Sequence, residues 1–274
     1  MRLSLSGLRG AKGSKRNSKL YDVAAQELVA SRQRHHPNPL TRYGKRGFSQ
    51  SDEDGITFEI IRRLGIQNGT FAEFGVGDGL ENNTLALLAA GWSGFWVGGE
   101  DLAFDTQKSS RLNYQKAWID RENALPLFQN GLNNIGREEV DVLSIDLDGN
   151  DLYICQELLG SGLQPLLVIL ECNAKFPPPM RFCIEYNAKH NWAKDDYYGA
   201  SLASLADMMM AFEYTLICCN AATGSNAFFI RQADRHLFPE VPEAIGQIYA
   251  QPNHLLPHKH GHSTSLKTIQ HMIE

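Results

Sequence analysis

The feature that most constrains this chain is a regular exchange of strand-like and helix-like segments between residues 55 and 171. Short apolar runs alternate there with stretches whose apolar residues recur at helical spacing. Strands joined by a helix are parallel, because the helical crossover returns the chain to the same end of the sheet. The sequence therefore predicts an α/β domain with a mainly parallel sheet and helices on both faces.

The expected elements can be placed by residue range. Strands are expected at residues 70–74, 94–97, 115–119, 140–145, 165–170, 214–218 and 227–231. Helices are expected at residues 56–64, 83–90, 105–114, 124–132, 152–159 and 201–212. The last two strands are separated only by residues 220–226, which is too short for a crossover, so they must be antiparallel. The predicted fold is a Rossmann-like, doubly wound sheet of about seven strands with the last one reversed.

Charge is distributed unevenly and divides the chain into three parts. Residues 1–46 hold eleven Lys or Arg against two acids, a charge of +9, whereas the remaining fifteen against twenty-nine give −14. We expect residues 1–46 to form a flexible basic arm, residues 47–234 the α/β domain and residues 235–274 a His- and Pro-rich tail. Contact of the arm with an acidic or phosphorylated partner is the alternative. The arm lacks interleaved aromatics, so no nucleic-acid module is expected.

The spacing of the histidines in the tail argues against a metal site, and the spacing of the cysteines argues against disulfides. Besides His236, the tail holds five irregularly spaced histidines, which favours a solvated tail; they are His254, His258, His260, His262 and His271. The five cysteines form no CxxC pair, which favours buried thiols in a reducing cytoplasm. No apolar run is long enough for a membrane span, and no secretory signal begins the chain. Oligomerisation stays open.

A glycine-rich turn follows the first expected strand. Glu73 ends that strand and precedes Gly75, Gly77 and Gly79. Such glycines let the backbone turn sharply and approach a ligand, and the following helix offers a positive N-terminus. The dinucleotide fingerprint is absent, because its third glycine is replaced by Leu80. Alternatively, the glycines only permit a tight turn.

Carboxylates gather where two later strands end. Asp146 and Asp148 follow residues 140–145, with Asp151 close behind. Three carboxylates within six residues repel one another, and a metal ion or a cationic group would relieve that repulsion. Glu171 and Asn173 follow the neighbouring strand and should lie beside Asp146. The alternatives are a simple turn and helix cap at residues 148–151, or direct hydrogen bonds to a substrate.

The glycine turn resembles the first motif of class I S-adenosylmethionine-dependent methyltransferases, as does the seven-strand outline. The resemblance implies that Glu73, Gly75, Gly77 and Gly79 hold the amino-acid part of the cofactor. That family usually places an acid for the ribose at the end of the second strand, where this chain has glycines at 98–99. The nearest candidates are Glu100 and Asp101.

The second carboxylate group resembles the site of metal-dependent catechol-type O-methyltransferases. This resemblance implies Mg²⁺ or Ca²⁺ held by Asp146, Glu171 and Asn173. Four segments, at residues 47–55, 73–84, 144–151 and 171–179, together look like the FkbM-like methyltransferases of sugar and polysaccharide gene clusters. The expected activity is O-methylation of a sugar, polysaccharide or other small hydroxyl acceptor. A degenerate relative that only binds or scaffolds, and another nucleotide-dependent enzyme, remain alternatives.

Three side chains are candidates for catalysis. A sugar hydroxyl needs a base or a metal, and Asp146 and Asp148 are the first candidates. His190, in the insertion after the fifth strand, is the third, although a lone loop histidine is more often inert. Aromatic residues of the insertion, at 192, 197 and 198, either form a lid over the acceptor or pack on the sheet edge.

Overall fold

A computed structural model describes residues 23–107, 109–253 and 273 and contains one seven-stranded sheet. The strand order is β3-β2-β1-β4-β5-β7-β6. The strands are β1 (Thr70–Phe74), β2 (Ser93–Gly98), β3 (Leu112–Lys116), β4 (Val142–Ile145), β5 (Leu167–Glu171), β6 (Tyr214–Cys219) and β7 (Asn226–Arg231). β7 pairs antiparallel with both β5 and β6, and the other four pairs of neighbouring strands are parallel. The predicted Rossmann-like, doubly wound sheet with its reversed last strand is confirmed.

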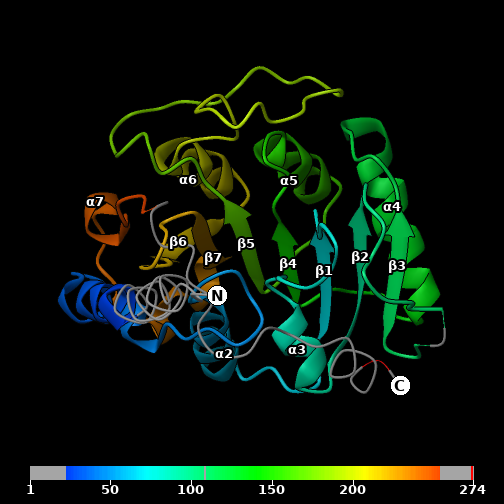
Figure 1. Ribbon diagram of the computed structural model, residues 1–274, viewed down its shortest axis with the longest axis horizontal. Coiled ribbons are helices and arrows are strands. Elements are labelled where there is room, and N and C mark those ends of the chain that lie inside the picture. Colours follow the sequence, from blue (N-terminus) through cyan, green and yellow to red (C-terminus); the bar gives the residue numbers. More distant parts are fainter. Residues whose placement is uncertain (1–22, 108, 254–272, 274) are drawn as a thin grey trace, which may run out of the picture.

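Helices cover both faces of the sheet (Figure 1). They are α2 (Glu53–Leu64), α3 (Leu85–Ala89), α4 (Arg121–Ile135), α5 (Asp151–Gly160), α6 (Leu202–Ala211) and α7 (Ile245–Ile248), with 3-10 turns η1 (Pro39–Tyr43) and η2 (Gln232–Leu237). In Figure 1, α4, α5 and α6 stand in a row on one face and α2 and α3 lie on the other. Because the central strands are covered on both sides, β1 and β4 are buried at every position.

The polar stretch before β3 differs from expectation. A helix was predicted at residues 105–114 and a strand at 115–119, but the structure has no helix there and places β3 at Leu112–Lys116. β3 is an edge strand that pairs only with β2, so most of its side chains are partly exposed. Polar side chains are tolerated on such an edge, and they hide the alternation that identifies a strand.

The chain on either side of the α/β domain packs against it. Residues 23–35 are helical, and η1 buries Leu40. The buried Asn38 donates from Nδ2 to the Ile217 carbonyl in β6, 2.7 Å away. Phe238 and Ala250, from the expected tail, are also buried. The segments 23–46 and 235–253 thus belong to the folded body, and residues 1–22 and the five tail histidines lie outside the described residues.

The long insertion between β5 and α6 runs beside the carboxyl ends of the strands (Figure 1). A short bridge between Cys183 and Ala200 brings its two arms together. All five cysteines are free. Among the described residues, no helix combines the length and the apolar character that crossing a bilayer requires.

Candidate functional site

The glycine turn after β1 joins the ends of three strands. The Gly75 amide donates to the Val97 carbonyl of β2 at 2.8 Å, and its φ is +86°. A Cβ at Gly75 would lie 1.7 Å from the Asp146 carbonyl oxygen, so only glycine lets β1 and β4 approach so closely. Gly77 also has a positive φ, +48°, but a Cβ there would meet nothing within 4 Å. Gly75 therefore serves packing, whereas Gly77 presents bare backbone to open space.

Glu73 is 2% exposed, and its carboxylate is held by protein donors. Oε1 accepts from the Asn83 amide at 2.9 Å, and Oε2 accepts from the Thr84 amide at 3.1 Å and the Thr84 hydroxyl at 2.5 Å. The amides that precede α3 are thus directed at Glu73, not at a ligand as the sequence predicted. Burial raises the pKa of Glu73 from its ordinary value of 4.5 to about 7, although these hydrogen bonds favour the ionised form.

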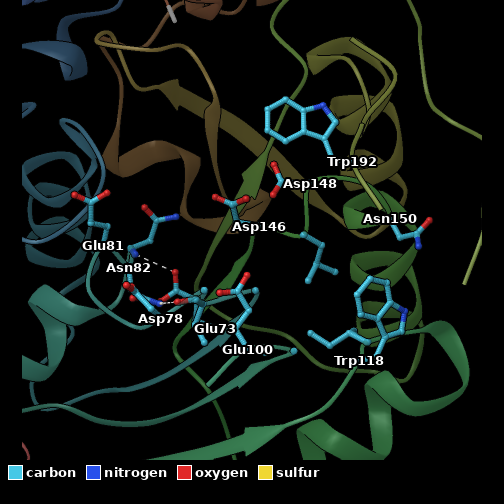
Figure 2. Close-up of a pocket in the computed structure, with 18 of the residues that line it drawn as sticks. Glu73, Asp78, Glu81, Asn82, Glu100, Trp118, Asp146, Asp148, Asn150 and Trp192 are labelled. Atoms are coloured by element: carbon cyan, nitrogen blue, oxygen red, sulfur yellow. Dashed lines mark hydrogen bonds between the residues drawn. The ribbon is translucent and has the colours of Figure 1, made fainter. Parts of the chain in front are cut away.

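A cavity of about 570 Å³ lies in front of this turn and joins it to the acids after β4. Figure 2 shows Asp146 and Asp148 between Glu73 and Trp192. Of the predicted site residues, the cavity is lined by Glu73, Gly75, Gly77, Glu100, Asp146, Asp148 and His190. Gly79 is not among the lining residues, because it packs against Trp96, Leu102 and Phe104.

The loop after β2 brings Glu100 to the cavity and turns Asp101 away. The Tyr114 hydroxyl donates to the Gly98 carbonyl at 3.0 Å and also to the Glu100 carbonyl, which holds this loop down. A Cβ at Gly98 would lie 2.9 Å from Val76, so a side chain would press against the glycine turn. Asp101 is exposed, pairs with Lys116 at 2.6 Å and does not line the cavity.

Three carboxylates converge after β4 and β5; Asp146 and Asp148 line the cavity, whereas Glu171 is not among its lining residues. Asp146, Asp148 and Glu171 each offer one oxygen within 4.8 Å of the others. Glu171 Oε2 is buried and has no hydrogen-bond partner. Burial raises the pKa of Asp146 and of Glu171 well above the usual range, and their neighbouring carboxylates raise both further. An all-oxygen group at this spacing is of the type that fits a divalent cation.

The turn-and-cap alternative is also present, on a different carboxylate. Asp151 accepts from the Leu147 amide at 2.7 Å and the Gly149 amide at 3.0 Å, which closes the turn before α5. Asp148 sits in this turn with a φ of +52°. Asp151 is therefore structural, whereas Asp146 and Asp148 face the cavity.

Asn173 does not present its amide to the three carboxylates. Its Nδ2 donates to the carbonyls of Asp196 and Tyr198, both at 3.0 Å, and its Oδ1 accepts from the Lys175 amide at 3.3 Å. The side chain of Asn173 is thereby committed to holding the insertion. The predicted metal ligands Asp146 and Glu171 come together without it.

The insertion forms one wall of the cavity through His190 and Trp192. The His190 ring lies against Gly149, where a Cβ would be 2.3 Å from His190 Cδ2, and His190 Nε2 is buried without a partner. Trp192 is 37% exposed and faces Trp118, 55% exposed, across the cavity mouth (Figure 2). Tyr197 and Tyr198 do not line the cavity. The insertion thus both covers the site and packs on it.

The opposite wall contains Gln50 and Asn226, which sequence analysis missed. Gln50 belongs to a loop in which Asp54 Oδ2 accepts from the amides of residues 47–49. Glu53, the first residue of α2, accepts from Asn220 and Asn226 through Oε1. Asp54 therefore holds the loop to the start of α2, and Glu53 holds the start of α2 to the first residue of β7 and the turn before it. The only sequence indication was the grouping of acids and turn-forming residues before α2.

The cavity wall is acidic and rich in acceptors. It contains Glu73, Asp78, Glu81, Glu100, Asp146 and Asp148, with Lys194 as the only Lys or Arg among the lining residues. Asn82 Oδ1 and Asn226 Oδ1, both in this wall, are buried acceptors without a donor. A buried acceptor without a donor costs about 1–3 kcal/mol. The site is therefore complementary to ligands that carry positive charge and hydrogen-bond donors.

The raised pKa of Glu73 predicts a pH-dependent stability. Between its unfolded pKa of 4.5 and its folded pKa of about 7, the folded state holds a proton that the unfolded state has lost. The free energy of unfolding should therefore fall as the pH rises from 4.5 through 7, by up to about 3 kcal/mol from this group. We expect Glu73→Gln to remove that part of the slope. Urea unfolding at pH 5 to 8 in chelator tests this; a wild-type-minus-variant difference that is constant with pH contradicts it.

Comparison with known proteins finds solved structures that resemble this chain weakly and at low sequence identity. No family model and no curated protein matches the sequence. The pyocyanin biosynthetic protein PhzM is 17% identical with a TM-score of 0.39, over 63% of this chain and 53% of PhzM. Coclaurine N-methyltransferase, solved with N-methylheliamine and SAH, is 14% identical with a TM-score of 0.33, over 73% of this chain and 65% of that enzyme. The chain thus spans about half the length of PhzM. These values are too low to assign an activity, which is inferred from the chain's own residues.

Proposed function

We propose that this protein is an S-adenosylmethionine-dependent methyltransferase that acts on a hydroxyl of a sugar, a polysaccharide or another small acceptor. One observation carries the proposal: a single cavity joins the glycine turn after β1 to the acids after β4. A methyl donor at the first place and an acceptor at the second would have their reacting atoms in the same cavity. Such positioning is the main requirement of an in-line displacement.

The glycine-turn end fits S-adenosylmethionine by shape and charge. Gly77 leaves the backbone bare where the amino-acid part would lie. The cofactor carries an ammonium and a sulfonium, and Glu73 and Asp78 supply negative charge in the wall. Asn82 Oδ1, which lacks a donor, is available for the ammonium. Glu100 is the carboxylate available for the ribose hydroxyls.

The second end fits a hydroxyl acceptor. Asp146 and Asp148 are in place to take the acceptor proton, and Trp118 and Trp192 offer apolar faces on which a sugar ring can stack. Asp146, Asp148 and Glu171 would hold a divalent cation. When bound, such an ion would lower the pKa of an acceptor hydroxyl. His190 Nε2 is a further group without a partner that can accept or donate a hydrogen bond at this end.

A binding or scaffold protein without turnover is the second candidate. Two observations favour it: Glu73 already has protein donors on both oxygens, and the second strand ends in glycines instead of an acid. Both candidates require the cofactor cavity, but only the first requires methyl transfer. Formation of S-adenosylhomocysteine in the presence of sugar acceptors therefore separates the two.

Cofactor binding is tested by calorimetric titration with S-adenosylmethionine, using two adjacent acids. We expect Glu100→Ala to weaken binding about tenfold, which corresponds to the loss of one charged hydrogen bond. Asp101→Ala is the matched control and should bind as the wild type does, because Asp101 is exposed and lies outside the cavity. Equal losses in the two variants would place the ribose elsewhere, and no heat with the wild type would remove the methyl donor altogether.

A further inference from the structure

Two buried hydrogen-bond acceptors, one at the end of β5 and one at the start of β7, lack a donor. Glu171 Oε2 and Asn226 Oδ1 are both inaccessible to solvent and have no hydrogen-bond partner. Glu171 and Asn226 are directly opposite one another in the antiparallel pair formed by these strands. Opposite residues project from the same face of a sheet, with Cβ atoms about 4.5–5.5 Å apart. When Glu171 is ionised, neither oxygen can donate to the other, so a group outside this pair must satisfy both.

The orientation of the Asn226 amide is set by its neighbours. Nδ2 donates to Glu53 Oε1 at 3.2 Å, and the Asn226 backbone amide donates to Asn220 Oδ1 at 2.9 Å. A flipped amide would place its oxygen against the Glu53 carboxylate, which is unfavourable. Asn226 is 4% exposed and lines the cavity, so its oxygen is the atom left over for a ligand.

We propose that Asn226 supplies an amide oxygen to the divalent cation that Asp146, Asp148 and Glu171 hold. This inference rests on the cation of the proposed function and adds to it a ligand from the last strand. A cation would accept both orphaned oxygens as ligands at once and would favour the ionised form of Glu171. Three carboxylates and one amide form an all-oxygen site, the type that suits Mg²⁺, Ca²⁺ or Mn²⁺.

This assignment also gives residues 51–54 a place in the site. Glu53 is fully buried and accepts from the Ser51 hydroxyl and from Asn220 as well as from Asn226. By holding the amide nitrogen, Glu53 acts as a positioning residue for the Asn226 oxygen. The start of α2 would therefore reach the cation through one intermediate side chain, that of Asn226.

The experiment measures binding of Mn²⁺ alone at pH 8, by the loss of the free-ion paramagnetic resonance signal, with Mg²⁺ and Ca²⁺ as competitors. We expect one ion per wild-type chain and at least tenfold weaker binding by Asn226→Ala. Asn226→Asp, made together with Glu53→Gln so that its second oxygen faces an amide and not a carboxylate, keeps the ligand oxygen and should bind at least as tightly as the wild type. Asn82→Ala is the matched control, because Asn82 is also buried with an orphaned Oδ1, but at the glycine-turn end of the cavity. Its Mn²⁺ affinity should stay within twofold of the wild-type value.

Three outcomes would overturn the inference: a wild type that binds no Mn²⁺ at millimolar concentration, a folded Asn226→Ala variant with unchanged affinity, or an Asn82→Ala variant that loses as much. Circular dichroism and urea unfolding establish that each variant is folded, and if Asn226→Ala is not, the double variant of Asn226→Asp with Glu53→Gln decides. A titration of the same proteins with S-adenosylmethionine in chelator separates the two proposals. Cofactor binding without ion binding refutes the Asn226 site alone, and ion binding without cofactor binding refutes the methyl-donor function alone.

Discussion

Replacing Gly75 with alanine should unfold the domain, whereas the same replacement at Gly77 should leave it folded but weaken its binding of S-adenosylmethionine. At Gly75 the new methyl group would lie 1.7 Å from a backbone oxygen, and relief requires β1 and β4 to separate at their carboxyl ends. We expect a cost above about 4 kcal/mol. At Gly77 the methyl group enters open space, so only the positive φ is penalised, by about 1–2 kcal/mol.

Urea unfolding and calorimetric titration measure the two effects separately. Gly162→Ala is the control for backbone strain, because Gly162 has a φ of +96°, has no neighbour near its Cβ position and lies outside the cavity lining. Its stability should fall as that of Gly77→Ala does, with unchanged cofactor affinity. We expect Gly77→Ala to lose at least about tenfold in affinity. If Gly77→Ala binds the cofactor normally, the amino-acid part does not lie against this turn.

The glycine turn could be predicted because the information is local. The backbone must turn directly after β1, and Gly75, Gly77 and Gly79 all have the positive φ values that such a turn requires. The three glycines lie close together in the sequence, so the turn can be recognised from the sequence alone. What the three glycines do individually could not be predicted. Gly75 makes room for Asp146, Gly79 makes room for Trp96, and Gly77 alone is open. Those partners come from other strands, so the difference between the glycines exists only in the folded sheet.

The carboxylate cluster was predictable in part for the same reason. Asp146 and Glu171 end adjacent parallel strands, and the strand order β4-β5 follows from the βαβ pattern. Asn226 comes from a strand inserted between β5 and β6, and in the sequence it looks like the last residue of a turn. Asn173 looked like the better ligand because it is close to Glu171 in sequence. The structure instead uses its amide to hold the insertion, a contact that depends on where residues 196–198 return.

The amides before α3, the first helix after the turn, donate to a protein side chain and not to a ligand. A helix N-terminus after a glycine turn is expected to face the ligand. Here α3 is short and begins ten residues after Gly75, and the amides that precede it donate to Glu73. The main role of Glu73 is therefore to link the turn to the start of α3 through hydrogen bonds, and its charge in the cavity wall is a secondary role. This is why the bare backbone of Gly77 and the orphaned Oδ1 of Asn82, rather than a helix end, face the cavity.

The second large effect is expected at the acids after β4. Asp146→Asn should lower the turnover of sugar acceptors by about a thousandfold, because it removes both the proton acceptor and a negative ligand. Asp148→Asn should cost about tenfold and leave stability unchanged, since asparagine tolerates the φ of +52° at that position. Affinity for S-adenosylmethionine should change less than threefold in both, because these acids lie at the acceptor end.

The measurement is S-adenosylhomocysteine formation with a panel of neutral sugars, with and without a chelator, between pH 6 and 9. Burial and the neighbouring carboxylates raise the pKa of Asp146, so wild-type activity should rise with pH above the range of an ordinary carboxyl group. Asp146→Asn should lack this rise. An Asp146→Asn variant that keeps a tenth of the activity or more would assign proton removal to another group, for which His190 is the nearest candidate. A wild type that binds the cofactor and turns over no acceptor would instead establish the scaffold function, since the same acids would then bind a ligand without reacting with it.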